Sequence, residues 1–388
     1  MRIPRLPEAT AWTTIVLALS LALAGCGSNT SSTGCGSNCP PNIQGFLYAG
    51  STGSIQTLTV DGITGALGNA VSTPGPQAPG GMVVDPASKF LYVSDLSNPT
   101  IDVFSITSGT GALTGAGSFT CRSGCGCSLS AISCPVLNLA MTPNGKFLYA
   151  IEASVYSTFC CFSTIAEWSV NSSTGGLTLI GYVTAGFNPV QMAIDPSGKF
   201  LYAPDQEDAN GSIYSFNIDA TSGALTPIAG SPFYTPSPGN PPIGVAVDPS
   251  GKYLYTALFF FVIQPYAIDP NTGALGPIAS SPATGGGNLS FLAMDPLGKF
   301  LYAGSNGGIL ALTLDPNSGV ASQVAGDPFN LGVFSWGNVL DPSGSFLYSA
   351  DYTGSIRTFR VNRTTGALSP LGQPASAGQN PLFLALAK

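Results

Sequence analysis

Short apolar segments alternate with glycine-rich turns along most of this chain, and one tripeptide marks their spacing. Phe-Leu-Tyr, with Tyr in place of Phe once, recurs seven times, in copies that begin at Phe46, Phe90, Phe147, Phe200, Tyr253, Phe300 and Phe346. Successive copies begin 44 to 57 residues apart. A period of this length predicts a propeller or a solenoid, in which each repeat is a small unit that packs on its neighbours.

Most repeats share one order of short elements. An apolar segment ends in Asp-Pro, as at residues 83–86 and 193–196, and a Ser-Gly-Lys turn and the Phe-Leu-Tyr segment follow. A loop of variable length leads to a third segment of alternating polarity, such as residues 101–104, and Thr-Gly-Ala-Leu opens a fourth. Four short strands with turn residues between them predict a propeller blade.

The two ends of the repeat region predict a closed ring. The chain enters the first repeat at a second strand, residues 45–46, and its last apolar segment, residues 382–386, matches the missing first strand. Closure of this kind would cover the edge strands that an open array exposes. We expect an all-β fold over residues 44–388, a single seven-bladed β-propeller of four-stranded blades. A linear solenoid is the alternative.

The N-terminal segment has a different character. Arg2 and Arg5 precede an apolar stretch at residues 11–24, which is too short to span a bilayer as a mature helix. The tetrapeptide Leu-Ala-Gly-Cys that ends at Cys26 resembles the lipobox of bacterial lipoproteins, and the resemblance implies cleavage before Cys26 and a lipid on that cysteine.

This resemblance predicts where the protein resides. We expect residues 1–25 to be a signal peptide and residues 26–43, rich in Gly, Ser, Asn and Pro, to be a lipidated flexible tether. The mature chain would then be anchored to a membrane outside the cytoplasm. Gly27 after the cysteine favours the outer membrane, if the cell has one. An ordinary secretory signal with an incidental cysteine is the alternative.

Charge and composition narrow the functions to be considered. The chain carries 12 Lys and Arg against 19 Asp and Glu, a formal net charge of −7, and has no His. Five lysines are spaced regularly along the repeats and form no basic patch, so we expect no nucleic-acid binding. Without His, the chain lacks the side chain most used in acid–base catalysis near neutral pH and the commonest metal ligand.

Several conspicuous Asp and Gly residues are interpreted as turn residues. The Asp of each Asp-Pro pair is followed, in most repeats, by Gly three residues later, which is the signature of a type I turn. These residues are Asp85, Asp195, Asp248, Asp295 and Asp341. The Gly of Thr-Gly-Ala-Leu is interpreted as the residue of positive φ that a tight connection needs.

Candidate catalytic residues come from comparing the repeats. The loops of variable length should share one face of the ring, and three positions after the Tyr of each tract, where the chain reaches that face, four of seven residues are acids. These are Asp95, Glu152, Asp205 and Asp351. Gathered at the mouth of a channel, they would raise one another's pKa or bind a cation such as Ca²⁺, with Glu207 and Asp208 as further ligands. Alternatively, each acid ends its strand with an Asx-type turn in water.

Cysteines and aromatic residues also fall near the variable loops. A location outside the cytoplasm favours disulfides, with a zinc site as the alternative, and the candidates are Cys35, Cys39, Cys121, Cys125, Cys127, Cys134, Cys160 and Cys161. An exposed group of large side chains is typical of a binding surface, although the blades could instead bury it. Its candidates are Arg122, Phe233, Tyr234, Phe259, Phe260 and Trp336.

The repeat resembles the seven-bladed lactonase family, the 6-phosphogluconolactonase-like propellers. The resemblance rests on Asp-Pro-Ser-Gly-Lys-Phe-Leu-Tyr, Thr-Gly-Ala-Leu-Thr and a Gly-Ser-Pro-Phe connection at residues 230–233. It implies lactone hydrolysis or the related cycloisomerisation, for which the family uses His, Arg and acidic side chains. This chain has no His, and no functional Arg can be carried over from the family, which leaves the acids. We therefore favour a binding or scaffold module that takes a small molecule, a glycan or a protein on its variable face. The alternative is a lactone hydrolase that uses the four carboxylates.

Overall fold

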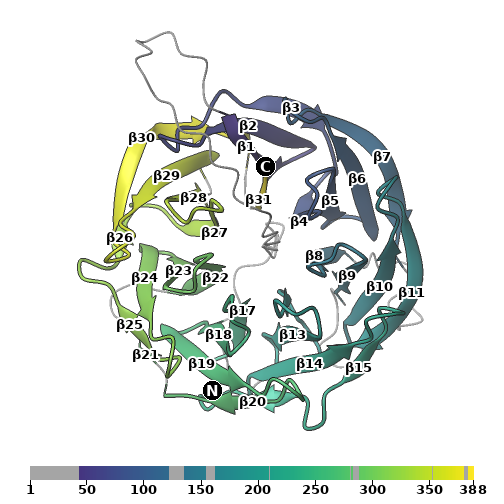
Figure 1. Cartoon of the computed structure of the whole chain (residues 1–388), viewed down its shortest axis with the longest axis vertical. Coiled ribbons are helices and arrows are strands. Elements are labelled where there is room, and N and C mark those ends of the chain that lie inside the picture. The colour runs from purple at the N-terminus through teal and green to yellow at the C-terminus, as the bar shows by residue number, and fades with distance from the viewer. Residues whose placement is uncertain are drawn as a thin grey trace, which may run out of the picture.

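The chain forms seven antiparallel sheets arranged in a ring (Figure 1). The structure is a computed structural model that describes residues 43–121, 135–153, 162–208, 210–279, 281–282, 288–351, 353–379 and 383–388. Each sheet has four strands, and three sheets carry one further short strand. The prediction of an all-β propeller with seven four-stranded blades is confirmed.

The blades are numbered by the Phe-Leu-Tyr tract that each contains, and their strands are given from the axis outward. Blades 1 to 3 contain β31 (Leu384–Ala387), β1 (Ile43–Ser51), β2 (Ser54–Asp61), β3 (Val71–Pro74); β4 (Pro79–Val84), β5 (Phe90–Asp95), β6 (Thr100–Ile106), β7 (Leu113–Thr120); and β8 (Val136–Met141), β9 (Phe147–Glu152), β10 (Thr164–Val170), β11 (Leu177–Thr184). Blades 4 and 5 contain β12 (Ala193–Ile194), β13 (Phe200–Asp205), β14 (Ser212–Ile218), β15 (Leu225–Pro227), with β16 (Phe233–Tyr234); and β17 (Pro242–Val247), β18 (Tyr253–Leu258), β19 (Val262–Ile268), β20 (Leu275–Pro277), with β21 (Ser281–Pro282). Blades 6 and 7 contain β22 (Leu289–Met294), β23 (Phe300–Ser305), β24 (Gly308–Leu314), β25 (Ala321–Gln323), with β26 (Phe329–Asn330); and β27 (Ser335–Leu340), β28 (Phe346–Asp351), β29 (Ser355–Val361), β30 (Leu368–Ser376).

The ring closes through the end of the chain. β31 pairs antiparallel with β1, in a register that joins Phe46 to Ala387 and Ala49 to Leu384. In Figure 1 the C-terminus lies inside the ring, next to the first blade. The last strand therefore completes a blade that began with the first one, which confirms the predicted closure, and the inner edge of β1 is paired.

Neighbouring blades are joined by an aromatic ring that packs on a glycine. The first residue of each Phe-Leu-Tyr tract lies against the Gly of the turn between the third and fourth strands of the next blade. The pairs are Phe46–Gly111, Phe90–Gly175, Phe147–Gly223, Phe200–Gly273, Tyr253–Gly319, Phe300–Gly366 and Phe346–Gly65. Every one of these glycines has positive φ, and a Cβ on any of them would lie under 3.0 Å from a ring atom.

The third residue of the tract uses the same glycine. In five blades the buried Tyr hydroxyl donates a hydrogen bond of 2.8–3.2 Å to the carbonyl of that glycine in the next blade. The donors are Tyr48, Tyr149, Tyr202, Tyr302 and Tyr348. Burial raises the pKa of each of these hydroxyls, so they stay protonated and can donate. The predicted role of the glycines in tight turns is thus only part of their role.

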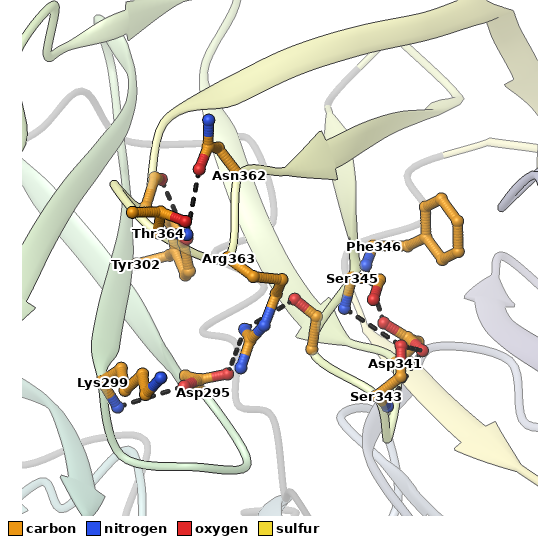
Figure 2. Close-up of polar contacts among 12 residues, drawn as sticks. Asp295, Lys299, Tyr302, Asp341, Ser343, Ser345, Phe346, Asn362, Arg363 and Thr364 are labelled. Carbon is orange, nitrogen blue, oxygen red and sulfur yellow. Dashed lines mark hydrogen bonds and ion pairs between the residues drawn. The ribbon is translucent and has the colours of Figure 1, made fainter.

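The Asp-Pro turns are structural, as predicted, and Figure 2 shows two of them. The Asp341 carboxylate accepts hydrogen bonds from Ser343 N and Phe346 N at 3.0 and 2.7 Å. The Asp295 carboxylate accepts from Lys299 N at 3.1 Å and from the Arg363 guanidinium of blade 7 at 2.5 Å. Each carboxylate thereby holds the turn that feeds the Phe-Leu-Tyr strand.

The predicted signal peptide, Cys26 and almost all of the tether lie outside the described residues. Within the residues that the structure does describe, no helix has the length and apolar character needed to cross a membrane. The lipid anchor therefore stays a prediction from sequence.

One connection carries a carboxyl group where a related blade has a hydroxyl. In blade 4, Ser231 Oγ accepts a hydrogen bond from Ser215 N, and in blade 6 the same role falls to Asp327, which accepts from Ala311 N at 2.6 Å. Burial raises the pKa of Asp327 to about 6. The folded protein therefore binds a proton at this carboxyl more tightly than the unfolded chain does.

Exchanging Gly273 for Ala tests the aromatic–glycine contact, with Gly276 as a matched control in the same hairpin. A Cβ at Gly273 would meet Phe200, whereas a Cβ at Gly276 meets nothing within 4 Å. We expect Gly273→Ala to lower the free energy of unfolding by roughly 2–4 kcal/mol, since left-handed strain and overpacking each cost about 1–3 kcal/mol. Gly276→Ala should change it by less than about 1 kcal/mol. Urea denaturation measures both, and equal effects would contradict the role of the contact.

The stability of the protein should depend on the titration of Asp327. Because its pKa is raised to about 6, its contribution is full below the unfolded-state pKa of about 3.9 and is lost as the pH rises through about 6. We expect Asp327→Ser to remove this loss, so that the variant gains stability over the wild type between pH 4 and pH 7. Thermal unfolding at a series of pH values is the measurement. Parallel pH profiles for the two proteins would contradict the prediction.

Candidate functional site

Exposed aromatic side chains gather on one face and on three neighbouring blades. Since adjacent strands are antiparallel, the ends of the second and fourth strands of every blade lie on the same face, which we call the variable face. Among the described residues, the large exposed aromatic side chains are Phe162, Phe187, Tyr234, Phe260 and Phe261. All five lie at variable-face connections of blades 3 to 5, whereas the other large exposed hydrophobic residues are aliphatic.

The four predicted catalytic acids lie where expected, at the variable-face ends of β5, β9, β13 and β28, and all four are buried. Asp95 accepts hydrogen bonds from Ser97 N and Asn98 Nδ2, both at 2.8 Å, in its own loop. Glu152 lies beside the buried thiol of Cys121; burial raises the pKa of that thiol, and the Glu152 carboxylate raises it further. The Asp95 carboxylate thus holds the base of its own loop, but it does so out of water.

Asp205 holds two connections of blade 4 together. Its side chain is fully buried and accepts hydrogen bonds from Phe187 N at 2.7 Å, Asn188 N at 2.9 Å and Glu207 N at 3.0 Å. Burial raises the pKa of Asp205, while the three backbone donors lower it. The carboxylate thus joins the connection from blade 3 to the loop between β13 and β14.

Asp351 is held in a different way, by a cation. One carboxylate oxygen accepts from Thr353 N at 2.8 Å and Ser355 N at 3.2 Å, and the other accepts from Arg357 Nε at 3.2 Å. The carboxylate is fully buried, whereas 30% of the arginine side chain is exposed.

The predicted metal ligands are engaged by separate donors. Asn188 Nδ2 donates to Glu207 Oε1 at 3.3 Å, and Asn210 N donates to Asp208 Oδ1 at 2.9 Å. No group of three His, Cys, Asp or Glu side chains within the described ranges is arranged to hold a metal ion. The four acids and their neighbours thus do not form a metal centre in this part of the chain.

Two carboxyl groups and two aromatic rings nevertheless form one connected group, the acidic–aromatic cluster, made of Phe162, Phe187, Asn188, Asp205 and Glu207. The rings of Phe162 and Phe187 are 4.8 Å apart between centroids. The Glu207 residue as a whole is exposed, whereas its carboxyl group is partly screened from water. This desolvation, and after it the nearby Asp205 charge, raise the pKa of Glu207. The cluster combines a titratable carboxyl group with an exposed aromatic surface.

The other residues of the predicted binding surface differ in how far their side chains are exposed. Tyr234 and Phe260 are exposed, whereas Phe233, Phe259 and Trp336 are half-buried and pack against the blade cores. Trp336 also stacks on Phe334, with ring centroids 4.4 Å apart. Arg122 lies outside the described residues.

Of the predicted disulfide cysteines, the described residues include one. Cys121 is a buried free thiol in this structure, and the expected disulfides, which involve only some of these cysteines, stay a prediction. The remaining candidates, Cys35, Cys39, Cys125, Cys127, Cys134, Cys160 and Cys161, lie outside the described residues.

Sequence reasoning missed Phe162, Phe187 and Asn188. Phe162 and Phe187 flank variable-face connections just as Phe259 and Phe260 do, so the same search for aromatic residues beside these loops would have found them. Asn188 carried no comparable signal, because its partner Glu207 is 19 residues away.

Comparisons with known proteins place the chain in a family. A family model described as "Lactonase, 7-bladed beta-propeller" matches residues 160–260 and 262–381. The 6-phosphogluconolactonase of Pectobacterium carotovorum is 30% identical over 168 residues, 41% of this chain and 46% of that protein. The 6-phosphogluconolactonase of Formosa agariphila is 38% identical over 89 residues, 23% of each chain. The matched segments thus span less than half of these relatives.

Solved structures share the fold. The periplasmic gluconolactonase of Pseudomonas aeruginosa superposes with a TM-score of 0.71 at 17% identity, over 89% of this chain and 99% of that one. A putative 6-phosphogluconolactonase of Bacteroides fragilis gives a TM-score of 0.70 at 17% identity, over 90% and 100% of the two chains. The family model covers more than half of the sequence, and the seven blades agree with it. The chain belongs to the seven-bladed β-propeller lactonase family.

Proposed function

We propose that the protein hydrolyses a sugar lactone on its variable face. Family membership supports this function better than the binding module that the sequence alone favours. The observation that carries the proposal is the acidic–aromatic cluster. In this cluster the Glu207 carboxyl group, whose pKa is raised, accepts a hydrogen bond from Asn188, the residue directly after the exposed Phe187. Aromatic surface and carboxylates together suit the apolar faces and hydroxyl groups of a sugar.

The chain offers a general base for this reaction. Ionised Glu207 takes a proton from water as the water oxygen attacks the lactone carbonyl carbon. The bond between that carbon and the ring oxygen then breaks, and the protonated carboxyl returns its proton to the ring oxygen. The product is the open-chain hydroxy acid. Asn188 orients the base through its hydrogen bond to Oε1, and Asp205 raises the proton affinity of Glu207 by like-charge repulsion.

The electrostatics of the cluster favour a neutral lactone over a phosphorylated one. Asp205, Glu207 and Asp208 lie close together, and like-charge interactions with neighbouring carboxylates raise the pKa of Asp205 and of Glu207. A phosphate dianion beside them would be repelled. Among the similar proteins, one is named a gluconolactonase and others 6-phosphogluconolactonases; the unphosphorylated lactone of the first name fits this preference better.

Glu207→Gln tests the base, with Asp219→Asn as the matched control. Asp219 is an acid of the same blade on the opposite face, where it caps a turn with Thr221 N and Ser222 N. We expect Glu207→Gln to lower kcat for glucono-δ-lactone at least about 100-fold, the usual worth of a general base, and Asp219→Asn to leave it unchanged. The measurement is pH-stat hydrolysis above the uncatalysed rate. Equal turnover in wild type and Glu207→Gln would remove the mechanism, and lactone binding without turnover would favour the binding module.

The pH profile gives a second test. Because the base must be ionised, kcat should rise with pH through the pKa of Glu207, at a pH above the ordinary Glu value of about 4.3. Asp205→Asn removes the neighbouring negative charge and should shift this midpoint to lower pH. Initial rates between pH 4 and pH 9 measure both midpoints. A midpoint that stays in place in the variant would contradict the coupling between the two carboxyl groups.

A further inference from the structure

A cavity between blades 6 and 7 lies apart from the acidic–aromatic cluster. Its volume is about 300 Å³, at the lower end of the range for small-molecule sites. β26 and the residue after it form one wall, through Phe329 and Leu331, and β29 and β30 form the other, through Phe359 and Leu371. Among the described residues that line it, Arg357 is the only charged one.

An irregularity in blade 7 opens this space. In the pairing of β29 with β30, Ile356 lies opposite Ala375 and Thr358 lies opposite Leu371. A single residue of β29, Arg357, therefore faces residues 372–374, and Gly372 takes a φ of +61° where the strand turns aside. The arginine consequently lies at a widened part of the sheet, beside the interface with blade 6.

The Arg357 side chain is held in place through one nitrogen, which leaves its terminal nitrogens for a ligand. Its Nε donates to the fully buried Asp351 at 3.2 Å, and Asp351 is itself held by Thr353 and Ser355. Within the described part of the chain, neither terminal nitrogen of this guanidinium makes a hydrogen bond. The side chain is 30% exposed, so these nitrogens can reach a ligand.

Comparison of the seven blades shows that the cation is peculiar to this site. The third residue of the third strand corresponds to Arg357 in each blade, and in the other six it is Gln56, Asp102, Ala166, Tyr214, Gln264 and Leu310. The fold therefore does not require a positive charge at this position. In blade 6, the equivalent Leu310 is fully buried in a core cluster.

We propose that this cavity binds a small organic carboxylate with an apolar body. A guanidinium fixed at Nε presents its two terminal N–H groups side by side, which matches the two oxygens of a carboxylate. The apolar walls would take a hydrocarbon or aromatic body and keep water from the ion pair. A monoanion suits the site better than a phosphate dianion, because the buried Asp351 carboxylate lies on the other side of the same guanidinium.

Titration with 3-phenylpropanoate, followed by calorimetry, tests the proposal. We expect saturable binding by the wild type, and at least about tenfold weaker binding of the neutral analogue 3-phenylpropanamide. Arg357→Gln should weaken binding of the carboxylate by a similar factor. Arg360→Gln is the matched control, because Arg360 lies on the same strand but packs over the Phe346 ring on the other face, and it should bind like the wild type.

A second variant separates binding from the stability of the ion pair. Leu371→Trp fills the cavity from the neighbouring strand β30 and leaves Arg357 and Asp351 in place, so it should abolish binding while thermal unfolding stays cooperative. The proposal is overturned if the wild type shows no saturable binding, if the amide binds as well as the acid, or if Arg357→Gln and Leu371→Trp both bind like the wild type. None of these outcomes depends on lactone turnover, so the two proposals fail independently.

Discussion

The contact between an aromatic ring of one blade and a glycine of the next is the interaction on which the rest of this ring depends. It occurs seven times, and the seventh, between Phe346 and Gly65, joins the last tract of the chain to the glycine turn of the first blade. Each contact needs both partners at once, because a side chain on the glycine would occupy the place of the ring. The Tyr hydroxyls that reach the same glycines add direction to an otherwise nonspecific apolar contact. Neighbouring blades are thereby fixed in both distance and rotation.

As a result, the two faces of the ring differ in how much their connections vary. One face holds the glycine turns and the Asp-Pro turns, which repeat with little change because each contacts a neighbouring blade or feeds a core strand. On the variable face, the connections differ in length and content from blade to blade. Buried acids at the strand ends then take over the task of fixing the loops, as Asp205 does for Phe187 and Asn188. The same device, in Asp351, orients the arginine of the cavity in blade 7.

The fold was accessible from the sequence because its signals are local and repeated. The turn residues and the strand order could be read within each repeat, and the period could be read from the spacing of the repeats. The closure of the ring followed from the first strand that the first repeat lacks. The hydrogen-bond partners of the acidic side chains could not be predicted from the repeats. Their positions at strand ends were predicted, but two of the three backbone donors to Asp205 lie 17 and 18 residues earlier in the chain, across a connection that no periodicity describes. The glycines were assigned to turns alone for the same reason, since Gly223 contacts Phe147 of a different repeat.

The pairing of β31 with β1 has a consequence for the strand edges that the ring can expose. Without residues 384–387 in place, the first sheet has three strands, and the hydrogen-bonding groups along the inner edge of β1 are unpaired. All seven Phe-Leu-Tyr tracts would then be present in an arc that one strand has left open. Release of β31 is therefore the smallest change that exposes a strand edge at the axis of the ring, and an extended segment of another chain could pair with that edge.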